Sequence, residues 1–223
     1  MSDPRDFHRL VRLLAPYRCK EVVARAHSAE LGPGTRGIEC AAWGEDGIAE
    51  LVPALRGELE TYVHLWDDSP RAAGRELRAL GFEELWTNEL LEAGASDLRG
   101  QSQAREIRTD EELAALARVL EAAHAPRMSP PRIRALRSGE VAGASFAQDG
   151  EVVYAADVFV HPHHRHEGHG RGLLLALGSI AREEGCGLVW ALPTRRARPF
   201  YAKLAFIPRA RVTTYRRAHA LQR

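Results

Sequence analysis

The sequence predicts an α/β protein in which a sheet is flanked by helices. Strand-like apolar segments alternate with helical patterns along most of the 223 residues. The pair Asp149-Gly150 separates two apolar runs, which is the strongest short-range signal of a β-hairpin. The second run, residues 151–160, leads through a glycine-rich segment directly into an Ala/Leu-rich helix that ends near Glu184. These three observations place a strand–turn–helix unit in the last third of the chain.

The first hundred residues carry weaker signals of the same class. Apolar residues at helical spacing predict a first helix over residues 4–17, and Gly32-Pro33-Gly34 predicts a loop. Further strands are expected at 38–43, 62–66 and 85–91, and helices at 48–55 and 70–80, the latter ended by Gly81. Residues 94–103 are small and polar, which predicts a linker.

The second half begins with a short strand at residues 105–108. Thr109 and Glu112 then form the pattern of a capping box, so a helix is expected from there to about Ala123. The remaining expected elements, in order, are a short helix at 133–136, strands at 143–148 and 151–160, the helix to 184, a strand at 188–192, a helix at 194–203 and a strand at 212–215.

Composition excludes several classes of protein. No apolar run approaches the about 20 residues that a membrane-spanning helix needs, and the N-terminus lacks the apolar core of a secretory signal. Three widely spaced cysteines give no disulfide framework and no CxxC pair, which predicts a cytoplasmic protein. The net charge is +1, but residues 151–223 carry +7 and residues 1–150 carry −6. A basic C-terminal part suits a polyanionic ligand or a solvated Arg-rich surface.

The segment from Asp157 to Leu173 carries the chemistry. The first N–H groups of a helix have no partner within the helix, and the helix dipole adds positive potential there. Gly168 and Gly170 would let a phosphate reach these N–H groups, and Arg165 and Arg171 add fixed positive charge. The spacing RxxGxG matches neither a Walker A loop nor a Rossmann fingerprint. The local physics therefore predicts a pyrophosphate site.

These residues resemble the GNAT superfamily of acyltransferases, whose signature reads roughly V-x-P-x-x-[RQ]-x-x-G-x-[GA]. The matching positions are Val160, Pro162, Arg165, Gly168, Gly170 and the following Leu173. His166 stands where these enzymes often carry glycine. A second match is Phe200-Tyr201-Ala202-Lys203-Leu204-Ala205-Phe206, which looks like the family's FYxKLGF motif with alanine in place of glycine. The resemblance covers residues from about 103 to 215.

The resemblance implies a mixed, mostly antiparallel sheet flanked by helices and an N-acetyltransferase that uses acetyl-CoA. The strand at 151–160 would splay from the strand at 188–192 and leave a gap for the pantetheine arm. An amine would attack the thioester directly, and Tyr201 would protonate the departing thiolate. The residues implied for binding acetyl-CoA are Val158, Phe159, Val160, Arg165, His166, Glu167, Gly168, His169, Gly170, Arg171 and Gly172.

Two questions about the site stay open at this stage. Asp157 is a candidate general base, but alternation along the strand could turn it away from the substrate, and water is an equal alternative. Five histidines lie between His161 and His169, yet no separate Cys/Asp/Glu set accompanies them, so no functional metal is expected. Protonated histidines could instead help to hold phosphates below about pH 6.5.

The chain is predicted to contain two domains, residues 1–100 and 103–223, with catalysis in the second. The segment around Leu80-Gly81-Phe82 echoes the one around Leu204-Ala205-Phe206, but Leu77 stands where the second copy has Tyr201. Residues 1–100 are thus either a degenerate GNAT-like half or an unrelated α/β cap. Their acidic balance would suit a cationic amine acceptor.

Two other readings of the function compete with the enzyme. A non-catalytic acyl-CoA-binding module would keep the glycine loop without needing Tyr201. A nucleic-acid-binding protein could use the C-terminal arginines, but no recognised nucleic-acid motif accompanies them. The sequence does not identify the acceptor, which could be a small-molecule or a peptide amine. It does not identify the acyl chain either. It also leaves open whether the protein is a homodimer.

Overall fold

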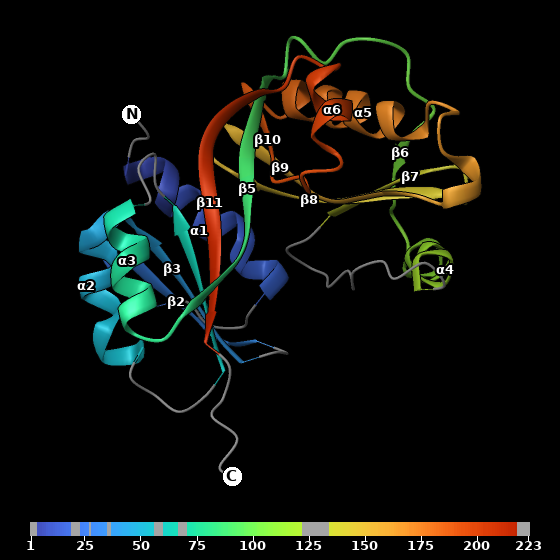
Figure 1. Ribbon diagram of the computed structural model, residues 1–223. Helices are drawn as coiled ribbons and strands as arrows, with labels where there is room; N and C mark the ends of the chain where they lie inside the picture. The colour runs from blue at the N-terminus through green and yellow to red at the C-terminus, as the bar shows by residue number, and fades with distance from the viewer. Residues whose placement is uncertain are drawn as a thin grey trace. The chain divides into compact units, whose positions relative to one another are not determined.

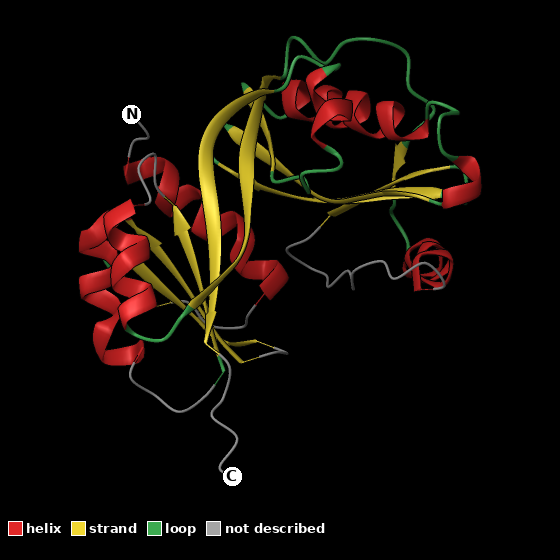
Figure 2. Cartoon of the chain, in the orientation of Figure 1, coloured by secondary structure: helices red, strands yellow, loops and turns green. Residues whose placement is uncertain are grey.

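The computed structural model describes residues 4–18, 23–26, 28–34, 37–55, 60–66, 71–121 and 134–217. The chain divides into two compact units, of which the first combines residues 1–90 with 208–223 and the second comprises residues 91–207. Each unit is a sheet with helices on its faces (Figures 1 and 2). The fold is therefore a mixed one in which the sheet is flanked by helices, as the sequence predicts.

The first unit contains a mixed sheet whose strands lie in the order β1-β2-β3-β4-β11-β5. Helices α2 and α3 cover one face with a core that includes Leu51, Val63 and Leu77. Helix α1 covers the other face, where Phe7 meets Trp66 edge to face at 6.2 Å. The elements are α1 Pro4–Arg18, β1 Val23–Ala24, β2 Ser28–Gly34, β3 Gly37–Trp43, α2 Gly44–Leu55, β4 Thr61–Trp66, α3 Arg71–Ala79, β5 Glu83–Gly94 and β11 Ile207–Arg217.

The second unit contains strands in the order β5-β10-β9-β8-β7-β6, with only β9 and β10 parallel. Helices α5 and α6 lie on one face of this sheet (Figure 2), over a core that includes Val153, Leu177 and Val189. Helix α4 lies on the other face, where Leu116 packs against Gly143. The elements are β6 Arg105–Glu106, α4 Asp110–Glu121, β7 Arg134–Ser138, β8 Ala142–Asp149, β9 Val152–Val160, the short 3-10 helix η1 Pro162–His164, α5 His169–Glu183, β10 Leu188–Ala191 and α6 Arg198–Ala202.

The two halves of the chain exchange their last strands. Strand β5 follows α3 in sequence, but its residues 91–94 pair antiparallel with β10 of the second unit. Strand β11 follows α6, but its residues 212–217 pair antiparallel with β4 of the first unit. The sequence-based division into residues 1–100 and 103–223 places β11 in the second domain. The strand pairing places it in the first unit instead.

The ends of α3 and α6 have the same backbone geometry. The N–H of Phe82 donates to the carbonyl of Leu77, and the N–H of Phe206 donates to the carbonyl of Tyr201, five residues back in both cases. This is the six-to-one bond of a Schellman motif, which requires a left-handed residue just before the donor. Gly81 has φ 82° and Ala205 has φ 61°. Helix α5 ends in the same way, since the N–H of Cys186 donates to the carbonyl of Ala181 after Gly185 at φ 74°.

Replacing Ala205 with glycine is expected to stabilise the protein by about 0.5–1 kcal/mol. An alanine at φ 61° has a side chain in the left-handed region, and removing it relieves more strain than the added freedom of the unfolded chain costs. Urea unfolding measures the change. The matched control is Ala202→Gly within α6, which is expected to lose up to about 1 kcal/mol because its conformation is helical. Equal destabilisation by both changes would contradict the assignment of strain to Ala205.

Three elements differ from the sequence prediction. Gly32-Pro33-Gly34 lies in β2 and not in a loop, because it pairs with the start of β3 through a register shift. The stretch predicted as a linker, 94–103, begins as the end of β5, and Leu98 then packs against Gly178 of α5. A Cβ on Gly178 would lie 2.4 Å from the Cβ of Leu98, so small residues here allow close packing.

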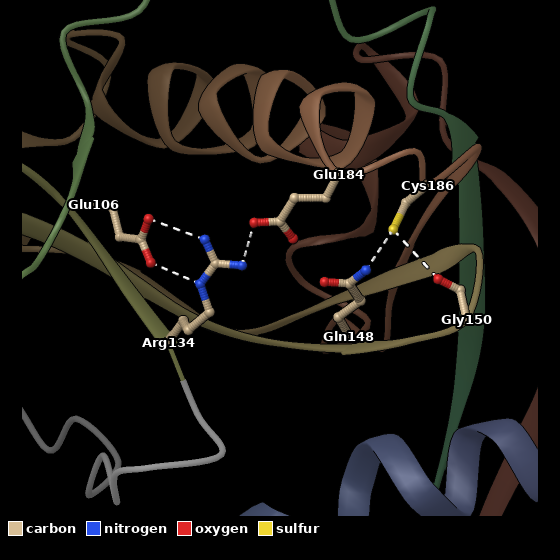
Figure 3. A network of polar contacts seen from close by, with 6 residues as sticks. All are labelled: Glu106, Arg134, Gln148, Gly150, Glu184 and Cys186. Atoms are coloured by element: carbon tan, nitrogen blue, oxygen red, sulfur yellow. Dashed lines mark hydrogen bonds and ion pairs between the residues drawn. The ribbon is translucent and has the colours of Figure 1, made fainter.

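The third difference is the helix predicted at residues 133–136, which is wrong, since β7 occupies residues 134–138 (Figure 3). The guanidinium of Arg134 donates to Glu106 of β6 at 2.6 and 3.0 Å and to Glu184 at 2.5 Å. It also lies 4.7 Å from the centre of the Phe146 ring on β8. These partners are far apart in the sequence, so the strand is determined by contacts that the local pattern does not contain.

The hairpin and the long helix are confirmed. Asp149 pairs with Val152 across a turn in which Gly150 has φ 57°. The N-cap of α4 is formed as well, because the hydroxyl of Thr109 accepts from the N–H of Glu112 at 3.2 Å, whereas the Glu112 carboxylate accepts from the N–H of Arg108 at 3.1 Å. None of the helices in the described ranges is both long and apolar enough to cross a membrane.

Candidate functional site

Strands β9 and β10 separate before β9 ends. Their parallel pairing runs from Val152 opposite Leu188 to Ala155 opposite Ala191, where β10 stops. Residues 156–160 of β9 continue and, among the described strands, pair only with β8. One edge of β9 is therefore free of a neighbouring strand over this stretch, as expected for the splay that the family resemblance implies between these two strands.

A β-bulge lies at the point of separation. Ala156 pairs with Ser145 and Phe159 pairs with Gly143, so one residue of β8 faces Asp157 and Val158 together. Asp157 has φ 50°, as the extra residue of a bulge often does. The bulge also changes the phase of the strand. Val153 and Ala155 belong to the core under α5 before it, whereas Val158 and Val160 pack on that core after it.

This change of phase settles the direction of Asp157. Ser145 lies on the sheet face opposite α5, between the core residues Ala144 and Phe146, and only 1% of its surface is exposed. Its hydroxyl donates to the Asp157 Oδ2 at 3.2 Å. The exposed carboxylate is therefore held on the face opposite α5, beside the separated edge of β9.

The loop after β9 brings the predicted phosphate residues to the start of α5. The N–H of His161 donates to Val141 at 2.8 Å, and η1 follows at Pro162. Gly168 is the N-cap of α5, and the first bond within the helix runs from the N–H of Gly172 to the carbonyl of Gly168 at 2.9 Å. The N–H groups of residues 169–171 precede this bond and point out of the helix start. The first turn carries no acidic residue.

Glycine is favoured at positions 168 and 170 for two different physical reasons. Gly168 has φ 91° and open space around its Cα, so backbone conformation selects glycine there. At Gly170 a Cβ would lie 3.2 Å from Phe200 and 3.5 Å from Val160, so close packing selects glycine. His166 has φ 71°, which is consistent with the glycine often found at this position in the resembling enzymes.

The remaining predicted binding residues lie around this helix start. Arg165 Nε donates to the carbonyl of Val160 at 3.3 Å, which holds the charged side chain across the end of β9. Arg171 and Gly172 are in the first turn of α5, and Ser102 Oγ donates to the carbonyl of Gly172 at 2.7 Å. Glu167 contacts the neighbouring histidines His164 and His169.

Tyr201 lies in α6, within the core under the loop. It is 5% exposed and packs edge to face against Phe200 and Phe206, with ring centres 5.3 and 5.2 Å away. Among the described residues no group hydrogen-bonds to its hydroxyl. Burial raises the pKa of Tyr201 above its ordinary value, and the nearby Tyr154 and Asp157 raise it further. The hydroxyl therefore stays protonated at neutral pH.

The part of the first unit where β3 leads into α2 differs from this arrangement, although Gly44, like Gly168, has a left-handed backbone, with φ 64°. Strands β3 and β4 stay paired over six positions, up to Trp43 opposite Trp66. Helix α2 begins at Gly44 directly after β3, and its first turn carries Glu45 and Asp46. Two carboxylates at a helix start disfavour an anion there, since they occupy the same positive potential.

Sequence reasoning missed three residues of the site. Ser145 orients Asp157, Ser102 contacts the first turn of α5, and Ser138 Oγ lies 2.9 Å from His169 Nδ1. A lone serine gives no signal in a sequence, because its partners depend on strand register. Within the described ranges, no group of three or more His, Cys, Asp or Glu side chains has the arrangement of a metal site.

Residues 101–206 match the sequence model of the Acetyltransferase (GNAT) family. The search of curated proteins gave no significant match.

Several solved structures share the fold over nearly the whole chain. A GCN5-related N-acetyltransferase from Kribbella flavida is 18% identical, with a TM-score of 0.68 over 96% of this chain and 94% of that one. Another from Sphaerobacter thermophilus is 13% identical, with a TM-score of 0.55 over 97% and 93%. A tandem GNAT protein from the clavulanic acid biosynthesis pathway is 12% identical, with a TM-score of 0.56 over 99% and 96%.

Proposed function

Because residues 101–206 match the sequence model of the Acetyltransferase (GNAT) family, we propose that this protein transfers an acetyl group from acetyl-CoA to a primary amine. The observation that carries the proposal is the separation of β9 from β10 directly before a glycine-capped helix start. A free strand edge and a cluster of free N–H groups are what an extended amide chain ending in a pyrophosphate needs.

The residues fit an acyl-CoA in a defined order. The backbone groups of Val158 and Val160 lie on the separated part of β9 and would bind the acyl carbonyl and the amides of the pantetheine arm. The N–H groups from His166 to Gly170 would bind the pyrophosphate, with Arg171 adding positive charge. A backbone N–H near the bulge would also stabilise negative charge that develops on the carbonyl oxygen.

Tyr201 and Asp157 supply the proton transfers. The amine nitrogen forms a bond to the carbonyl carbon, the carbon–sulfur bond breaks, and the thiolate takes the proton of the Tyr201 hydroxyl. The proton lost by the amine goes to Asp157, directly or through a water. Ser145 would hold the Asp157 carboxylate in place through the hydrogen bond from its hydroxyl.

The first unit would take no part in binding acetyl-CoA. Its paired strands leave no gap for a pantetheine arm, and its acidic helix start would repel a pyrophosphate. We therefore propose that it is a degenerate GNAT-like half and that each chain binds one donor molecule. The buried thiols of Cys40 and Cys186 are consistent with a reducing, cytoplasmic location.

Calorimetric titration with acetyl-CoA, CoA and ATP tests the donor site. Acetyl-CoA and CoA are expected to bind, whereas ATP, which has no pantetheine arm, is expected to give no saturable heat at the same concentrations. Binding of ATP as tight as that of CoA would show a general polyphosphate site and would contradict the proposed donor. Absence of heat with all three ligands would remove the basis of the proposal.

A further inference from the structure

A polar cluster surrounds Glu167 at the start of α5. The Glu167 Oε2 lies 3.2 Å from His164 Nδ1 and 3.5 Å from His169 Nε2. The other ring nitrogen of His169 lies 2.9 Å from the hydroxyl of Ser138, which comes from the end of β7 and is 4% exposed. The rings of His164 and His169 are edge to face, with their centres 6.4 Å apart. One carboxylate is thus shared by two imidazoles.

The position of Glu167 conflicts with the proposed ligand. It is one of the loop residues whose N–H groups would bind the pyrophosphate, and its negative charge opposes an anion there. The side chain is 52% exposed, so solvent screens this charge in part. Protonation of one flanking imidazole cancels the charge of Glu167, and protonation of both gives the cluster a net positive charge beside the phosphate. Histidine is the side chain that changes charge between about pH 5 and 8.

The other charged groups of this region do not oppose the effect. Arg165 and Arg171 keep their positive charge over the whole range. The ring centre of His161 lies 5.9 Å from that of His164 and 5.4 Å from that of His163. From β7, the group that faces His169 is the neutral hydroxyl of Ser138.

We propose that Glu167, His164 and His169 couple binding of the donor's phosphates to uptake of a proton. The inference rests on the proposed function and adds a regulation of the same site: the donor binds more tightly as the pH falls from 8 to 6. The sign follows from linkage, because a phosphate stabilises the protonated imidazoles, so the gain is present at low pH and is lost as the pH rises. One linked proton changes Kd by up to about tenfold per pH unit.

The experiment is calorimetric titration of CoA at about pH 6, 7 and 8, each in two buffers of different ionisation enthalpy. The difference in heat between buffers gives the number of protons taken up. The wild-type protein is expected to take up a fraction of one proton for each CoA bound near pH 7. It is also expected to bind CoA about fivefold more weakly at pH 8 than at pH 6. Pantetheine, which lacks the phosphates, is expected to bind without proton uptake.

Three variants separate the cluster from titration of the CoA phosphate itself. The double variant His164→Asn/His169→Asn is expected to lose the pH dependence and to bind at pH 6 about as weakly as the wild type at pH 8. Glu167→Gln is expected to bind more tightly than the wild type at pH 8. The control is His163→Asn, an exposed histidine of the same short helix that does not contact Glu167, and it is expected to behave as the wild type.

The outcomes distinguish this inference from the proposed function. CoA binding with the same proton uptake in the wild type and in the double variant would overturn the coupling and leave the donor site intact. CoA binding that is independent of pH in the wild type would do the same. Failure of CoA to bind at every pH would overturn the proposed function and the coupling together.

Discussion

Replacing Tyr201 with phenylalanine is expected to lower kcat for acyl transfer by about 10²–10⁴-fold, the usual contribution of a general acid. The change removes only the hydroxyl, for which no hydrogen-bond partner is found among the described residues, so the free energy of unfolding is expected to change little. Binding of acetyl-CoA is also expected to be kept, because the ring still packs between Phe200 and Phe206. Steady-state release of the CoA thiol measures the effect.

The matched control is Tyr215→Phe, which removes the hydroxyl of a buried tyrosine in the first unit and is expected to leave kcat unchanged. Unchanged turnover in Tyr201→Phe would exclude this residue as the acid. Wild-type binding of acetyl-CoA without any turnover would instead favour a non-catalytic acyl-CoA-binding module.

The same assay, run as a function of pH, tests the roles of Tyr201 as acid and Asp157 as base. Because burial raises the pKa of Tyr201, the protonated acid persists through neutral pH, and no loss of rate from its ionisation is expected below about pH 10. Asp157→Asn is expected to abolish the acidic limb of the kcat/KM profile if this carboxylate accepts the amine proton. An unchanged acidic limb would assign the base to water.

Deleting residues 208–223 is expected to unfold the first unit, although these residues follow the second unit in the sequence. The deletion removes β11 from beside β4, where it pairs from Val212 to Arg217. It also removes Tyr215, whose ring is 1% exposed in the core with Leu77 and Phe82. Loss of one such aromatic side chain alone costs about 3–5 kcal/mol, a large share of the stability of a typical domain.

Hydrogen exchange of the backbone amides of β4 measures this effect. The control is deletion of residues 218–223 only, which keeps all of β11 and is expected to leave protection of β4 unchanged. Full protection of β4 after the longer deletion would contradict the exchange of strands between the two halves.

The parts of the site that were predictable depend on short stretches of sequence. The hairpin at Asp149-Gly150, the glycine-capped start of α5 and the position of Tyr201 all follow from residues close together in the chain. Their geometry is set locally, by a turn, a helix start and a helix end. The mixed, mostly antiparallel sheet expected from the resemblance is found as well.

The parts that were missed depend on distant partners. Strand β7 is short and Arg-rich, and it becomes a strand through Glu106, Phe146 and Glu184, none of which its own pattern contains. The pairing partners of β5 and β11 could not be predicted from their own residues, because an alternating apolar pattern fits any neighbouring strand. The bulge at Asp157 reverses the phase of β9, so simple alternation gave no answer for the direction of its carboxylate.

The most direct test of the central claim is the stoichiometry of acetyl-CoA binding by calorimetry, with Gly170→Val as the comparison. The wild-type protein is predicted to bind one molecule per chain. The variant is predicted to lose binding, because its side chain would have to occupy the space of Phe200 and Val160 at the start of α5. A far-ultraviolet circular dichroism spectrum equal to that of the wild type would show that the variant is folded. Absence of binding to the wild type, binding of two molecules per chain, or full binding by the folded variant would contradict the account.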